Sequence, residues 1–127
     1  MIGQVMLYLG AALTAVWGIA HLFPISSVVK GFGTISTDNQ HIITMEWINE
    51  GIFLIFIGAL VTCVTFIDPV ATVSKAVFLL SAIGLFVLAV VSLFTGFKVK
   101  FLPFKLCPVI FTVSALLILT GMLFIKS

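Results

Sequence analysis

The sequence predicts an all-α fold, a single-domain integral membrane four-helix bundle. Hydrophobic residues make up 62% of the 127 positions, and charged residues only 8%. A soluble domain is about a quarter charged, so this chain has too few charges to coat a water-facing surface. Four apolar runs, about residues 3–23, 42–67, 71–97 and 106–125, are each long enough to cross a bilayer core of about 30 Å.

Two other interpretations of these runs are disfavoured. Barrel strands alternate polar and apolar residues over about ten positions, whereas these runs are apolar on every side. A signal peptide needs a basic segment before its apolar core, but the first run follows Met1, Ile2, Gly3 and Gln4. We therefore expect the first run to be a helix of the mature protein.

The first apolar run carries small residues at helical spacing. Ala11, Ala15 and Gly18 follow one another at intervals of four and three, so they share one side of the helix. Small residues let membrane helices approach closely, and the later runs offer matching surfaces. These are Gly51, Gly58, Ser81 and Gly84.

The three connections differ in character. Residues 24–41 form the longest one, which we expect to be an interfacial loop with one amphipathic turn around residues 26–29 and with Asp38 capping the next helix. The second is a tight turn at Asp68-Pro69, and the third is basic and contains Pro103 and Pro108.

Lysine bias predicts the orientation in the membrane. Connections one and three lie on one face, and the termini and connection two lie on the other. The first face has Lys30, Lys98, Lys100 and Lys105, and the second has Lys75 and Lys126. We therefore expect a multi-pass protein of the cell membrane with connections one and three in the cytoplasm and both termini outside.

Helix geometry groups several polar side chains near the face that carries connections one and three. Glu46 and Glu50 are four residues apart and so lie on one side of the second helix, with Asn49 beside them. A short connection makes the first two helices antiparallel, which brings His21 towards the depth of the glutamates. Trp17, four residues before His21, is expected to roof the resulting polar pocket.

Each of these residues also has a purely structural interpretation. Glu46 is close enough to the interface to be solvated or to complement the positive end of the helix dipole. Glu50 lies deeper, where a carboxylate is costly unless it is paired, protonated or facing a cavity. His21 can donate to a backbone carbonyl, whereas Trp17 and Trp47 can anchor their helices at the interface. Trp47 is expected to point away from the pocket.

Other kinds of site are disfavoured. The histidines and glutamates of this region could supply zinc ligands, but they show no paired spacing such as HExxH, and His41 is expected to lie in water. We expect no metal ion, haem or other cofactor. The six lysines form no cluster that would bind nucleic acid. Cys63 and Cys107 are expected near opposite faces, too far apart for a disulfide, and to serve in packing.

The stretch EGIFLIFIGAL, residues 50–60, resembles the DoxX-like family of small four-helix membrane proteins. In that family a glycine and a basic residue stand near the end of the first helix, here Gly18 and His21. The second helix opens with a glutamate followed by glycines, here Glu50, Gly51 and Gly58. The segment LPFKLCPVIF, which leads into the fourth helix, is also similar to the family.

The resemblance covers most of the chain and implies the fold more than an activity. Two features depart from it: Asp68-Pro69 replaces a basic residue after the second helix, and the first connection is long, with Asp38 and His41 in it. The family resemblance implies an accessory subunit of a membrane redox enzyme or a protein without a defined role.

Three functions stay open on these residues. The first is a membrane protein that binds a small molecule or lipid at Glu50, Glu46 and His21, with Glu50 as the titrating group of a proton-linked carrier. The second is an accessory or assembly subunit, in a homo-oligomer or with a partner membrane protein. The third is an enzyme acting on a lipid substrate through acid–base chemistry, and we rank it last because so few polar groups are present.

Overall fold

The computed structural model describes residues 1–125 and is an all-α bundle. Four of its helices are long and apolar enough to cross a membrane, the third of them including the short turn η1. The predicted fold class is therefore confirmed. The elements are α1 (Ile2–Leu22), α2 (Ile25–Gly31), α3 (Thr37–Ile67), α4 (Thr72–Phe94), η1 (Gly96–Lys98) and α5 (Leu102–Phe124).

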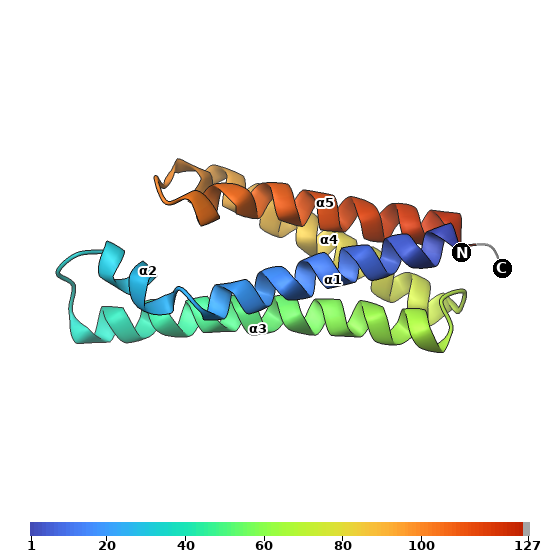
Figure 1. The fold of residues 1–127 in the computed structure, drawn as a ribbon, viewed down its shortest axis with the longest axis horizontal. Coiled ribbons are helices and arrows are strands. Elements are labelled where there is room, and N and C mark those ends of the chain that lie inside the picture. The colour runs from blue at the N-terminus through green and yellow to red at the C-terminus, as the bar shows by residue number, and fades with distance from the viewer. Residues whose placement is uncertain (126–127) are drawn as a thin grey trace.

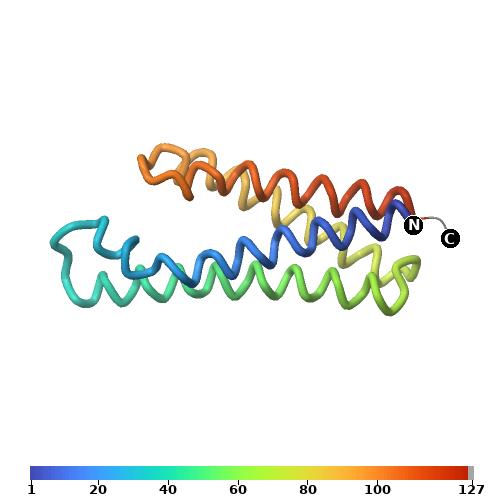
Figure 2. Tube along the Cα trace, viewed as in Figure 1, coloured from blue at the N-terminus to red at the C-terminus, as the bar shows by residue number. Residues whose placement is uncertain are grey.

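Helix α1 is the centre of the bundle (Figure 1). It packs along α3 on one side and along α5 on another, and α4 packs along α5. The consecutive helices α3 and α4 contact each other only sparsely. The tube in Figure 2 shows the consequence: the α3 and α5 sides come together near the termini and diverge towards the end that carries α2.

The backbones of α1 and α3 approach each other closely because small residues face each other in the contact. A Cβ atom built on Gly18 would lie 2.6 Å from the carbonyl oxygen of Gly51, and one built on Gly58 would lie 2.6 Å from that of Ala11. Such distances leave no room for a side chain. The predicted pairing of the small-residue stripe in α1 with the glycines of α3 is therefore confirmed.

A second set of small residues joins α1 to α5 near the termini. A Cβ on Gly3 would lie 2.7 Å from the carbonyl oxygen of Gly121, and one on Gly10 would lie 2.9 Å from the Ile118 side chain. Gly84 was expected to offer a matching surface, and this was wrong, because no atom of another described helix lies within 4 Å of a Cβ built there. This glycine faces open space rather than a neighbouring helix.

The core between these helices is apolar and tightly filled. Its fully buried side chains include Leu7, Leu54, Phe78, Phe111 and Ile118. The hydroxyls of the buried threonines Thr14 and Thr65 form hydrogen bonds within their own helices. They donate to the carbonyl oxygens four residues earlier, at 2.8 and 2.6 Å. Such local bonds allow hydroxyls to sit in a membrane bundle without a cross-helix partner.

The first connection is more helical than expected. It contains the short helix α2 in place of a single turn, and α3 begins at Thr37 rather than near residue 42. Ser36 caps α3 by accepting a bond from the Asn39 amide at 3.2 Å, so the assignment of Asp38 as the cap was wrong. The apolar run did not reveal residues 37–41 as the start of α3, because these residues are mostly polar although their backbone is helical.

The ends of the last two membrane helices also differ from the apolar runs. Helix α4 ends at Phe94, and η1 follows it where the sequence predicted a continuous helix to about residue 97. Helix α5 begins at Leu102, before the predicted residue 106, because Pro103 occupies its first turn, where a missing amide costs nothing. Pro108 is accommodated inside α5.

The lysines of the described chain are concentrated at the α2 end. Lys30 is in α2, Lys98 ends η1, and Lys100 and Lys105 flank the start of α5. Lys75 lies in the first turn of α4, at the opposite end, and Lys126 lies outside the described residues.

Gly58→Ala is expected to destabilise the bundle, and Gly84→Ala is expected not to. Both changes gain helix propensity of about 1 kcal/mol, but only the first places a Cβ against the Ala11 carbonyl and the Ala15 side chain. Overpacking of this kind costs about 1–3 kcal/mol. Unfolding of the purified protein by added sodium dodecyl sulfate measures both variants, and equal midpoints would contradict the close α1–α3 contact.

Candidate functional site

A cavity of about 860 Å³ lies where the two halves of the bundle diverge. Residues from α1 to α5 and from η1 line it, and most of them are apolar. The polar and titratable residues among them are His21, Ser27, Glu46, Asn49, Glu50, Ser92, Thr95 and Cys107.

The α3 and α5 sides diverge towards the α2 end because the residues between the helices differ in size. Near the termini, Gly3, Gly10 and Gly121 bring α1 and α5 together. At the other end, the aromatic side chains of Trp47 and Phe104 stand between α3 and α5, with ring centroids 5.2 Å apart. Small residues at one end and large rings at the other force the helices apart, which opens the cavity.

His21 is the most enclosed polar group of the cavity, with 3% of its side chain exposed. Its Nδ1 atom lies 2.7 Å from the Trp17 carbonyl oxygen, which can only accept, so Nδ1 carries a hydrogen. The indole N–H of Trp47 donates to the carbonyl oxygen of His21. Both the ring and the backbone of His21 are therefore fixed by neighbouring residues.

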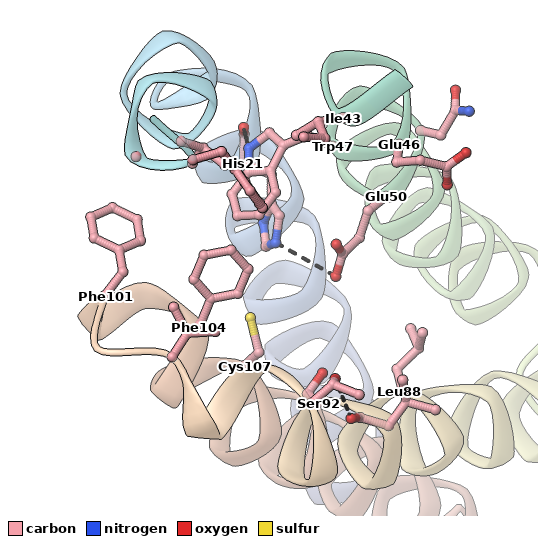
Figure 3. A pocket seen from close by; sticks show the side chains of 18 of the residues that line it. His21, Ile43, Glu46, Trp47, Glu50, Leu88, Ser92, Phe101, Phe104 and Cys107 are labelled. Atoms are coloured by element: carbon pink, nitrogen blue, oxygen red, sulfur yellow. Dashed lines mark hydrogen bonds and ion pairs between the residues drawn. The ribbon is translucent and has the colours of Figure 1, made fainter. Parts of the chain in front are cut away.

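Aromatic rings enclose the imidazole from two sides. Trp17 meets it edge-on, with centroids 5.5 Å apart and planes at 84°, and Trp47 lies across it at 5.0 Å and 34°. Beyond Trp47 the series continues to Phe104 and then to Phe101 on the far wall, as Figure 3 shows. The rings hold the imidazole in one orientation, with Nε2 turned towards α3.

His21 and Glu50 form the one ion pair of the described chain, with Nε2 and Oε1 3.6 Å apart (Figure 3). The 3.6 Å separation is too long for a hydrogen bond, and Nε2 has no hydrogen-bond partner among residues 1–125. Because Nδ1 already carries a hydrogen, a neutral imidazole would present a lone pair from Nε2 to the lone pairs of a carboxylate. One additional proton, on Nε2 or on Glu50, removes that repulsion, so we infer that the pair holds a proton.

The other predicted residues take different places. Glu46 and Asn49 line the cavity but are exposed, and in Figure 3 the Glu46 carboxylate points away from the imidazole. Trp17 does not line the cavity, so the expectation that it roofs the pocket was wrong. It packs against the core instead, because one residue along a helix turns by about 100° and its neighbour Gly18 faces α3.

Trp47 was expected to point elsewhere, and that was also wrong. It is 8% exposed, lines the cavity and contacts His21. The sequence spacing could have shown that Trp47 is buried. Trp47 lies four residues before Gly51, and Gly51 lies three residues before Leu54, so all three share the buried face of α3.

The wall from α4 and α5 was not anticipated. Ser92, Phe101, Phe104 and Cys107 all line the cavity, and the Cys107 sulfur points into it in Figure 3. Both cysteines are free, and Cys107 is buried as expected for packing, but Cys63 is exposed, so its assignment to packing was wrong. No spacing rule links residues so distant in sequence to His21.

The donor set does not suit a metal ion. Within residues 1–125, no three His, Cys, Asp or Glu side chains converge closely enough to hold one. His41 is exposed on α3 and does not line the cavity. His21 and Glu50 are groups that can exchange a proton and form hydrogen bonds.

Trp47→Phe is expected to lower the stability by about 1–3 kcal/mol, because it leaves the buried His21 carbonyl without its indole donor. Trp17→Phe is the matched control. Within the described chain the buried Trp17 indole N–H makes no hydrogen bond to nitrogen or oxygen and faces only the weakly accepting thiol of Cys107, so its removal should cost less. Detergent unfolding measures both, and an equal or larger loss for Trp17→Phe would show that the hydrogen bond to His21 is unimportant.

Comparison with known proteins found no match to this chain. No protein-family model matches the chain, no curated protein matches it, and no solved structure matches it. The resemblance to DoxX-like proteins therefore stays a prediction, and any functional assignment rests on the geometry of the cavity.

Proposed function

We propose that this chain is a multi-pass membrane protein that binds a small apolar molecule or a lipid in the cavity. The polar group of the ligand lies at the His21–Glu50 pair. The observation that carries the proposal is the buried Nε2 of His21, which faces a large cavity and has only the distant carboxylate of Glu50 as a partner.

The size and lining of the cavity support a ligand of this kind. Pockets for small molecules span about 300–1,000 Å³ and combine apolar walls with a few fixed polar groups. This cavity has a volume of about 860 Å³. The rings of Trp47 and Phe104 and the side chain of Leu88 supply apolar surface, and His21 and Glu50 supply the polar centre.

The sparse contact between α3 and α4 supports access from the bilayer. Phe53 of α3 and Val91 of α4 both line the cavity, and both are 53% exposed. An apolar molecule dissolved in the lipid would therefore enter sideways between these two helices, and would not need to cross water.

A proton-linked carrier is the form of this function that the His21–Glu50 pair favours. Intramembrane carboxylates and histidines commonly mark proton pathways, and Glu50 retains 35% side-chain exposure towards the cavity. The concentration of lysines at the α2 end supports placing the cavity mouth on the cytoplasmic side.

Ser92→Phe is expected to abolish saturable labelling of the cavity by a diazirine-bearing long-chain alcohol in phosphatidylcholine nanodiscs. The new ring would occupy the space beside Glu50, because Ser92 lines the cavity from α4. Photolabelled peptides are mapped by mass spectrometry with and without excess decanol, and decanol should suppress labelling around Phe104 and Cys107 in the unaltered protein.

Leu80→Phe is the control, because Leu80 lies on the same helix and is 68% exposed. It should leave the saturable labelling unchanged. If decanol suppresses no labelling in the unaltered protein, the cavity does not bind such molecules and an accessory role becomes the better interpretation.

A further inference from the structure

Four titratable groups line the cavity, and two of them are carboxylic acids. They are His21 from α1, Glu46 and Glu50 from α3, and Cys107 from α5. None of the lysines in residues 1–125 lines the cavity, although four of them lie at the same end. With two carboxylates and no fixed cation, the cavity has an electrostatic preference for positive ligands.

Several helices contribute side chains around the His21–Glu50 pair. Among these side chains, only His21 can neutralise the charge of Glu50. Helix α4 contributes the uncharged Ser92, and α5 contributes the thiol of Cys107. The side chain of Lys30 on α2 is exposed. Lys105 on α5 lies 6.0 Å from the ring centroid of Phe97, which is not a lining residue.

The two polar atoms at the centre are both acceptors once their shared proton has left. Nε2 of His21 and Oε1 of Glu50 are 3.6 Å apart, close enough for one donor atom between them to reach both. A hydroxyl has one hydrogen and satisfies one of them. A primary or secondary ammonium has at least two N–H groups and satisfies both, with a charge opposite to that of the carboxylate.

We propose that the ligand is a lipophilic primary or secondary ammonium ion, which the site binds in exchange for the proton shared by His21 and Glu50. This inference rests on the proposed function and specifies its ligand class. Before binding, one proton lies between Nε2 and Oε1. After binding, the ammonium donates one N–H to each atom, and the displaced proton leaves to water at the mouth beside Glu46. One positive charge enters as another leaves.

The walls suit the remainder of such a ligand. Trp47 and Phe104 stand beside the pair, where aromatic faces attract a cation, and Phe53 and Leu88 provide apolar surface for its chain. A free amine and the amine of a lipid headgroup share this chemistry. The headgroup adds a phosphate, which the two carboxylates disfavour, so the experiment tests both sources.

The test compares three ligands of equal chain length in phosphatidylcholine nanodiscs: decylammonium, decyltrimethylammonium and decanol. Isothermal titration against empty nanodiscs corrects for partition into lipid. Decylammonium should bind most tightly, decyltrimethylammonium less tightly because it cannot donate to Nε2, and decanol most weakly. Charge-assisted hydrogen bonds of this kind correspond to about a tenfold to hundredfold difference in affinity.

Glu50→Gln keeps the shape of the side chain and removes its charge. It should weaken decylammonium binding by about tenfold to hundredfold and change decanol binding little. Asp38→Asn is the matched control, because it removes a carboxylate from the first turn of the same helix, outside the cavity. It should leave all three affinities unchanged.

The exchange itself is read from the pH dependence of decyltrimethylammonium binding, because the charge of that ligand does not vary with pH. A proton competes with the cation, so affinity should be low in acid and rise with pH, by up to about tenfold per unit while one proton is released for each cation bound. In Glu50→Gln the dependence should become shallower, because only the His21 imidazole is left to take up the proton. An affinity independent of pH in the unaltered protein would overturn the exchange.

Replacing part of the phosphatidylcholine by phosphatidylethanolamine distinguishes the two sources. Competition by the lipid against decylammonium would identify the headgroup amine as the ligand, and unchanged binding would identify a free amine. If decanol binds as tightly as decylammonium, and Ser92→Phe blocks both, the ammonium inference fails while the proposed cavity function stands. If no probe binds in a manner that Ser92→Phe blocks, both fail.

Discussion

The close packing of α1 against α3 determines how His21 and Glu50 lie relative to each other. Gly18 and Gly51 allow the two backbones to touch, and the same register sets Glu50 against His21 on the next turn. A larger residue at either glycine would separate the helices and lengthen the gap between the imidazole and the carboxylate. The stability of the bundle and the geometry of the pair therefore depend on one contact.

That register also explains why two tryptophans with similar surroundings have different roles. The Trp47 indole reaches across to the His21 carbonyl and fixes α3 to the end of α1. The Trp17 carbonyl, rather than its indole, accepts the hydrogen bond from Nδ1 of His21. The backbone of one tryptophan and the side chain of the other thus position the same histidine, with Nε2 3.6 Å from Oε1 of Glu50.

The cavity is a result of unequal residue size along the bundle. Glycines close the end near the termini, and aromatic rings separate the helices at the α2 end. Helices α3 and α4 make few contacts, so the proposed route for an apolar ligand runs between them.

The four membrane helices, the small-residue contact of α1 with α3 and the approach of His21 to Glu50 could all be predicted from the amino-acid sequence. These follow from apolar run length and helical spacing, which are local properties of the chain. The sequence misplaced Trp17, Trp47 and the start of α3, because a single-residue rotation and a polar helical turn leave hydropathy unchanged.

The cavity and its wall of α4 and α5 residues, among them Ser92, Phe104 and Cys107, could not be predicted in this way. The space between helices depends on how residues far apart in sequence fill it, and no spacing along one helix records that.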